Sequence, residues 1–160
     1  LFFLTEDISI GALVSTFNSY SSDIFSFPVE DFPDSLVVGP YNTDISLLFI
    51  GPSLMGRYYF RNPSWLINYS FSAGYLRYKE EVFLVDQELL AEGGTFGLNG
   101  DFGLEYLMSP GVAIGAGVGF GLGGISNLDV TIDGRTERVE LEESEGLGRL
   151  EFFFGLRYHL

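Results

Sequence analysis

The stretch that decides the fold reads VAIGAGVGFGLG and occupies residues 112–123. Apolar side chains alternate there with small residues, mostly glycine, and a period of two is the side-chain period of a β-strand. A helix would scatter these glycines around its whole surface, whereas a strand places them all on one face. The uncharged segment 106–127 is long enough for a membrane-spanning helix, but Pro110 and the period of two favour a strand.

Four further segments alternate in the same way, at residues 48–60, 65–78, 95–108 and 147–160. A sixth strand is expected at about 8–17, where the facing is less regular, and residues 1–4 look like the tail of a strand that begins upstream. The apolar faces comprise the even-numbered positions of 48–60, 96–106, 112–122 and 150–160 and the odd-numbered positions of 65–75. None of these positions is charged, although 19% of the chain is.

The connections between these segments alternate in length. Tight turns are expected at 5–7, 61–64 and 109–111, where Pro-Gly suits a type II turn. Long loops are expected near 18–43, 79–94 and 126–146, and Asp133-Gly134 in the last one suggests a hairpin tip that extends two strands beyond the membrane. Short turns on one side and long loops on the other are typical of outer-membrane β-barrels. The chain is therefore read as a single all-β domain over 1–160, an antiparallel up-and-down transmembrane barrel.

The opposite faces of the strands are small and polar, which suits the inside of a narrow barrel. They hold the charges that we expect to form a lumen cluster: Arg57, Asp101, Glu105, Arg149, Glu151 and Arg157. Arg57, Glu105 and Arg157 each lie three residues from the turn end of a strand, which predicts a similar depth. Since an eight-stranded barrel has just enough room for side chains, we expect no open pore.

Aromatic residues on the apolar faces gather next to the tight turns and the C-terminus. Amphipathic rings settle at membrane interfaces, so these positions predict an aromatic girdle at one end of the barrel. Most of the 22 acidic residues instead fall in the three long loops, which places nearly all of the net charge of −14 outside the expected membrane. The expected girdle comprises Tyr58, Phe60, Trp65, Tyr106 and Tyr158.

Three short runs carry a resemblance over nearly all 160 residues: 49–53 (FIGPS), 71–75 (FSAGY) and 155–158 (GLRY). With them the chain resembles the small outer-membrane β-barrel family common in Bacteroidota. The resemblance implies eight strands, contact with outer-membrane lipid and insertion by the barrel-assembly machinery. Six strands and a tail are counted, so the first strand and most of the second are expected upstream of residue 1. The chain departs from the usual C-terminal aromatic, because it ends in Leu160.

Composition excludes several kinds of chemistry. The strongly negative charge argues against a nucleic-acid partner, and the absence of cysteine excludes disulfides and thiolate sites. His159 is the single histidine and is expected to be a polar lumen residue. Gly119, Gly121 and Gly124 fit a dinucleotide-binding string, but no helix follows them. No cofactor and no catalytic group of residues is predicted, and no run has the ligand spacing of an EF-hand, although calcium binding by a loop stays open.

Three functional interpretations remain at this point. The first is a non-enzymatic outer-membrane barrel whose acidic extracellular loops serve surface interaction or envelope structure, with an unknown ligand. The second is an outer-membrane enzyme that modifies lipid. The third is a soluble, lipocalin-like binder of an apolar ligand, which would place its large apolar side chains inside and its charges outside.

Overall fold

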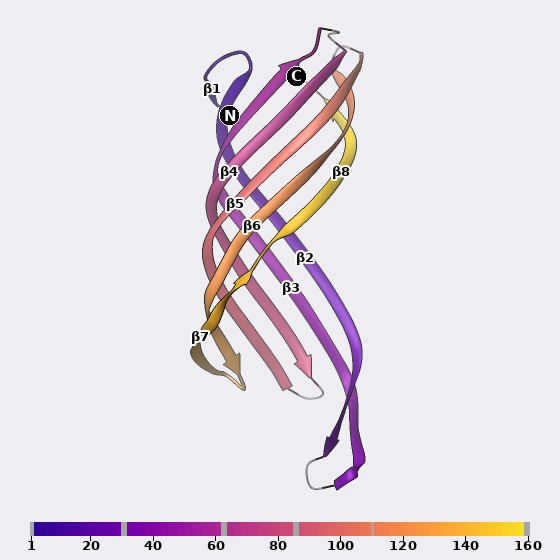
Figure 1. Ribbon diagram of the computed structural model, residues 1–160, viewed down its shortest axis with the longest axis vertical. Coiled ribbons are helices and arrows are strands. Elements are labelled where there is room, and N and C mark those ends of the chain that lie inside the picture. The colour runs from indigo at the N-terminus through magenta and orange to yellow at the C-terminus, as the bar shows by residue number, and fades with distance from the viewer. Residues whose placement is uncertain (1, 30–31, 62–63, 85–86, 110, 159–160) are drawn as a thin grey trace.

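The computed structural model describes residues 2–29, 32–61, 64–84, 87–109 and 111–158. Consecutive strands among these residues pair antiparallel from β1 to β7 in chain order, and β8 pairs with β6. The fold is an all-β, up-and-down sheet, as the alternation predicts (Figure 1). Its strands are β1 (Phe2–Phe3), β2 (Ile8–Val29), β3 (Phe32–Tyr59), β4 (Trp65–Leu84), β5 (Gln87–Ser109), β6 (Val112–Ile132), β7 (Arg135–Gly146) and β8 (Arg149–Tyr158).

The last two strands lie end to end along β6. β7 pairs with residues 124–132 of β6, and β8 pairs with residues 112–121. The break between them is bridged by the backbone N–H of Leu147, which donates to the carbonyl oxygen of Gly123 at 2.8 Å. The strand expected at 147–160 therefore begins at Arg149, and β7 is the second strand of the hairpin that Asp133-Gly134 predicts.

The described parts of the segments expected as long loops, 18–43, 79–94 and 126–146, are mostly β-strand, and the sequence predicted strands only for the last of them. In these segments the strands continue as paired hairpins, with Asn18 opposite Ser46 and Lys79 opposite Glu92. Pairing continues in these polar segments because the ladder consists of backbone hydrogen bonds, which do not depend on the polarity of the side chains. The hairpin tip at Asp133-Gly134 is confirmed: the φ angles of 50° and 76° suit a two-residue type I′ turn.

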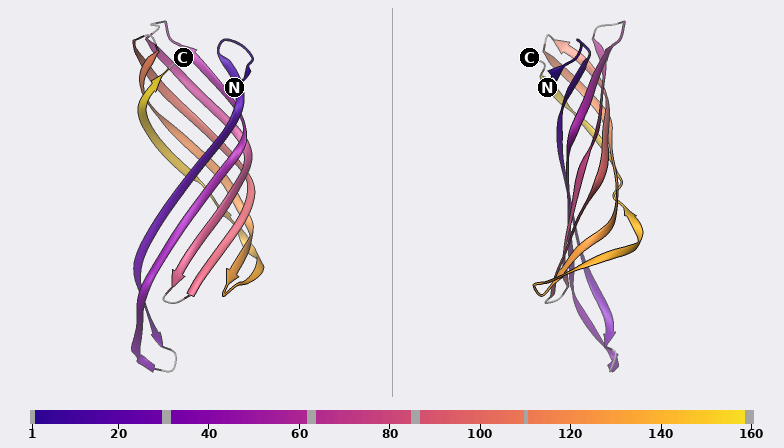
Figure 2. Two further views of the ribbon diagram at one scale, coloured as in Figure 1. Left: turned by 180° about the vertical axis from the view of Figure 1, so that it is seen from behind. Right: turned by 90° about the vertical axis from the view of Figure 1, so that its left-hand side faces the viewer.

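The two ends of the sheet differ. The connections after β1, β3 and β5 lie at one end together with both termini, and this end is called the turn end (Figure 1). The hairpins β2–β3, β4–β5 and β6–β7 have their tips at the other, tip end, and the β2–β3 hairpin reaches farthest (Figure 2). Gly111 has a φ of 86°, as the expected turn requires, while Pro110 lies outside the described residues.

The described strands do not close into a barrel, because no pairing joins β8 to β1 or β2. The sheet is nevertheless curled. Arg149 Nη2 on β8 donates to Ser15 Oγ on β2 at 2.5 Å, although these strands lie at opposite sides of the sheet. The concave side is called the inner face and the convex side the outer face. No helix in the described part of the chain is long and apolar enough to cross a membrane.

Candidate functional site

The outer face carries the apolar positions that the alternation predicts, and it leaves them exposed. Phe96 retains 66% of its surface, Phe102 52% and Phe152 78%. The name apolar band is used for the described outer-face positions within 8–16, 48–60, 65–75, 96–108, 112–122 and 150–156. None of them is charged, and the band ends on β4 just before Arg77, which forms an exposed ion pair with Glu92 at 2.7 Å.

Two glycines interrupt the band, and both lie beneath aromatic rings. Gly56 is paired with Tyr69 across β3 and β4, and Gly100 is paired with Phe120 across β5 and β6. A Cβ added to Gly100 would lie 2.6 Å from Cζ of Phe120, so the ring occupies the place of the missing side chain. Such aromatic cover over glycine keeps a strongly curved sheet continuous and apolar.

The structure places the expected girdle residues at the turn end of the band. Tyr58 and Phe60 pack edge to face with ring centroids 5.8 Å apart. Trp65 and Tyr106 are cross-strand partners, and their rings lie 5.0 Å apart. All four rings remain exposed. The backbone of Tyr158 pairs with Val112 at the same end, and its side chain lies outside the described set.

The turn-end half of the inner face is polar. Ser70 donates to Asp101 at 2.8 Å, and Asn68 donates to the buried carboxylate of Glu105. Closer to the tip end, Arg149 forms an ion pair with Glu151 at 3.0 Å. A cavity of about 350 Å³ opens on this half between β2, β3, β4, β5 and β8.

The predicted lumen charge cluster is brought together only in part. Arg149 and Glu151 meet, but Arg57 is exposed and forms no ion pair with any described side chain. The register explains this: Arg57 lies level with Asn68 and Gly103, whereas Glu105 lies one inward-facing row closer to the turn end, level with Leu66. Arg57 and Glu105 therefore lie in different cross-strand rows, which counting residues from the strand ends does not show.

The remaining member of that cluster is Arg157, whose side chain lies outside the described set. Its backbone pairs with Ala113 on β6, while Glu105 pairs with Gly115. The backbone of Arg157 is thus a further row toward the turn end. His159, the expected polar lumen residue, lies outside the described residues.

Glycines on β6 make room for the inner-face side chains of both neighbouring strands. Gly115 is paired with Glu105, Gly119 with Asp101, and Gly121 with Arg149. An added Cβ would lie 2.6 Å from Glu105 Cγ, 2.7 Å from Asp101 Oδ1 and 3.0 Å from Arg149 Nε, respectively. The glycines of residues 112–123 therefore leave the space that these charged side chains occupy.

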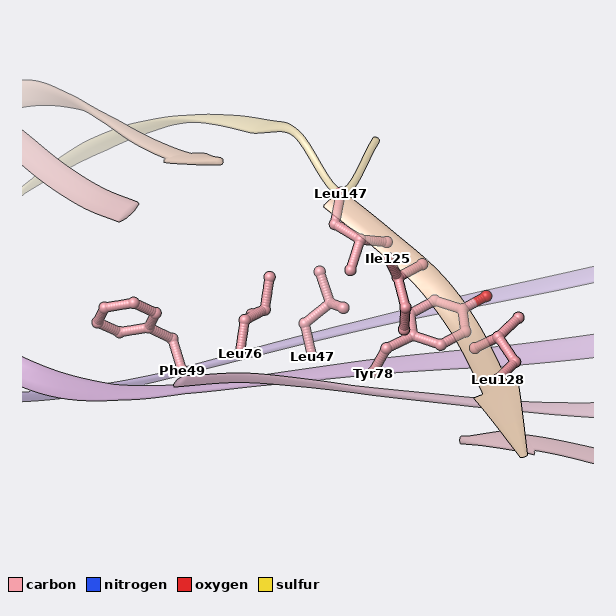
Figure 3. Packing of buried hydrophobic residues seen from close by; sticks show 7 residues of the cluster. All are labelled: Leu47, Phe49, Leu76, Tyr78, Ile125, Leu128 and Leu147. Carbon is pink, nitrogen blue, oxygen red and sulfur yellow. The ribbon is translucent and has the colours of Figure 1, made fainter. Parts of the chain in front are cut away.

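An apolar cluster that the alternation of the strands does not predict fills the tip-end half of the inner face. Figure 3 shows the side chains from β3 and β4 facing those from β6 and Leu147. The hydroxyl of Tyr78 donates to Glu80 Oε2 at 2.6 Å. The inner cluster, as it is called below, comprises Leu47, Phe49, Leu76, Tyr78, Ile125, Leu128 and Leu147.

A signal for this cluster exists in the sequence. Leu47 and Phe49 alternate on the face opposite to Leu48, so the β3 segment is apolar on both sides there. Leu13 behaves similarly: it disturbs the alternation of the first long strand, and the structure packs it against the inner cluster. A strand segment that is apolar on both faces thus indicates that the inner face is apolar at that level.

The comparisons with known proteins add no family assignment. No family model matches the chain, and no curated protein matches it significantly. In the described residues no group of three or more His, Cys, Asp or Glu side chains is placed to hold a metal ion.

Proposed function

We propose that this chain forms the greater part of a transmembrane β-barrel of a bacterial outer membrane. In this proposal it is a non-enzymatic protein whose acidic hairpins stand outside the cell and serve surface interaction or envelope structure. It contacts outer-membrane lipid through the apolar band, and the barrel-assembly machinery inserts it.

The apolar band carries this proposal. Soluble monomers seldom expose contiguous apolar patches larger than a few hundred Å², yet here exposed large apolar side chains follow one another across β2, β3, β4, β5, β6 and β8. A lipid-facing surface requires this composition, because a charge near the bilayer centre costs roughly 2–4 kcal/mol. A soluble lipocalin-like binder would need the reverse arrangement, with its charges on the outside.

Closure of the sheet is part of the proposal. In a membrane every backbone polar group needs a partner, so an open edge is not tolerated in lipid. Beyond Ile10, most of the edge of β2 faces no described strand, and neither does the outer edge of β8. The bond between Arg149 and Ser15 holds these edge strands toward each other across the inner face. We expect further strand pairing to join them, consistent with an eight-stranded barrel.

The inner face supports a closed, non-catalytic interior. Several of its polar groups engage each other, as Ser70 does with Asp101 and Arg149 with Glu151. The inner cluster fills the tip-end half with packed apolar side chains. The charge of the hairpins sets the orientation: β7 alone carries five glutamates, and long charged hairpins belong outside the cell.

Arginine substitutions in the band test the proposal. Phe102→Arg and Val118→Arg should each lower the free energy of unfolding in liposomes by roughly 2–4 kcal/mol, because both place a charge at the middle of the band. Ile132→Arg is the matched control: it lies on β6 like Val118 and is similarly exposed, but at the hairpin tip. Folding as stable as that of the parent for both band variants would contradict the membrane assignment.

A further inference from the structure

A hollow on the outer face at the turn end combines apolar walls with one cation. It has a volume of about 480 Å³ and is lined by Phe60, Arg61, Trp65 and Leu104. The hollow lies where the β3–β4 hairpin turns, and the N–H of Phe60 donates to the carbonyl oxygen of Trp65 at 3.1 Å to hold this hairpin together.

The two aromatic walls are fixed by their neighbours. Trp65 rests against Tyr106, and Phe60 rests against Tyr58. Leu104 forms the apolar floor one outer-face position further into the apolar band than Tyr106. The hollow thus runs from the middle of the band toward the turn end, between rings whose packing limits their movement.

Arg61 is the one charged residue among the described residues that line the hollow. It directly follows Phe60, is exposed, and forms no ion pair with any described side chain. A guanidinium held beside an apolar hollow at the edge of a lipid-facing band matches the anatomy of a phospholipid, in which an anionic headgroup joins acyl chains.

We propose that this hollow binds one phospholipid of net negative charge from the leaflet at the turn end. An acyl chain lies over Leu104 between Phe60 and Trp65, and the phosphate receives hydrogen bonds from Arg61. The inference rests on the proposed membrane location and goes beyond it, because a general lipid-facing surface would not distinguish one headgroup from another.

The only tryptophan of the chain lies in this hollow, so its fluorescence reports on the site alone. The protein is reconstituted in vesicles that mix phosphatidylglycerol with phosphatidylcholine, with bromine on the acyl chains of one lipid at a time. Bromine quenches a tryptophan that it touches. We expect the quenching of Trp65 by brominated phosphatidylglycerol to correspond to an about fivefold enrichment of this lipid around the hollow. One basic side chain near an anionic headgroup supplies a factor of this size. The enrichment should fall as salt is added.

Two variants assign the enrichment to the guanidinium. Arg61→Gln should abolish it, and Arg61→Lys should keep most of it. Arg135→Gln removes the same charge at the tip end and should leave it unchanged. Circular dichroism confirms that each variant is folded before it is compared.

The outcomes separate this site from the membrane proposal. Equal quenching by both brominated lipids, or enrichment that survives Arg61→Gln, would overturn the lipid site and leave the membrane location standing. Absence of quenching by either lipid would instead contradict the membrane location, and with it the site.

Discussion

At the scale of single residues, glycine is placed where a neighbour needs space. Gly51 and Gly74 illustrate the strictest case: a Cβ added to Gly51 would lie 2.8 Å from the Cα of Gly74, so the two backbones approach each other directly. On β6 the missing side chains instead admit Glu105, Asp101 and Arg149. The same residue type thus permits close backbone packing at one level and buried polar side chains at another.

Alanine substitution should separate a crowded glycine from an open one. Gly115→Ala would place a Cβ 2.6 Å from Glu105 Cγ and 2.9 Å from the carbonyl oxygen of Leu104, which belongs to the backbone and cannot rotate away. We expect a loss of about 1–3 kcal/mol in the free energy of unfolding, measured by urea titration in liposomes.

The cross-strand partner of that glycine supplies the control. Gly155 pairs with Gly115, and a Cβ added to Gly155 would have no atom of the described residues within 4 Å. Gly155→Ala should therefore change stability by less than about 0.5 kcal/mol. Equal losses for the two variants would contradict the inner-face placement of Gly115.

The interaction energy between two charged residues of the inner face should depend on whether the structure brings their side chains together. The double-mutant cycle of Arg149→Ala and Glu151→Ala should give an interaction of roughly 1 kcal/mol, since the Arg149 side chain is 11% exposed and that of Glu151 is 44% exposed. The cycle of Arg57→Ala and Glu105→Ala should give less than about 0.5 kcal/mol, because Arg57 lies in another row. A stronger coupling in the second cycle would show that the charges do meet.

At the scale of elements, the strands with one apolar face and the β6–β7 hairpin were predictable, whereas the extensions of β2, β3, β4 and β5 were not. The period of two in the sequence predicts a strand with one apolar face, such as residues 112–122 of β6. The segment 18–29 of β2 is rich in Ser, Asn and Asp, which resemble loop residues, and its strand state depends on pairing with β3. A single sequence does not display that partner.

The candidate site was predictable to the same extent. Which side chains share a face follows from parity alone, so both the apolar band and the inner polar positions could be assigned. Which side chains touch depends on register, and for that reason Glu105 accepts a hydrogen bond from Asn68 while Arg57 lies in another row. Register is set by the joint stagger of all strands, which no individual strand encodes.

The hairpins should be distinguishable by their side of the membrane. The chain has no cysteine, so single cysteines can be introduced and labelled with a membrane-impermeant maleimide. Glu137→Cys on β7 should be labelled on intact cells, because the tip-end hairpins stand outside. Glu6→Cys in the turn between β1 and β2 should react only after the outer membrane is permeabilised. Labelling of residue 6 but not of residue 137 would invert the orientation.

At the scale of the whole molecule, the inner face has two zones along the strands. Rows around Asp101 and Glu105 are polar and surround a cavity, whereas rows around Phe49 and Leu76 are packed and apolar. A path for ions would have to cross both zones, and the apolar one offers no group to replace the water around an ion. The described inner face thus combines a cavity at one end with a packed apolar cluster at the other.

This zoning predicts a barrel without a pore. The protein in planar bilayers should give no steady single-channel conductance, because the inner cluster blocks the interior at the level of Leu47 and Tyr78. A steady unitary current from the purified protein would contradict a blocked interior.

Two adjacent leucines test whether the inner cluster is a packed core. Leu47 is 7% exposed on the inner face, and Leu48 is 37% exposed on the outer face. Leu47→Ala should cost about 2–5 kcal/mol in the free energy of unfolding in liposomes, since it leaves a cavity among side chains that cannot fully collapse. Leu48→Ala should cost clearly less, because mobile lipid chains can fill the space that the side chain leaves. Since the two residues share one strand and one substitution, strand propensity cancels in the comparison. Equal costs would mean that the two faces pack alike, and the distinction between a packed inner cluster and a lipid-facing band would fail.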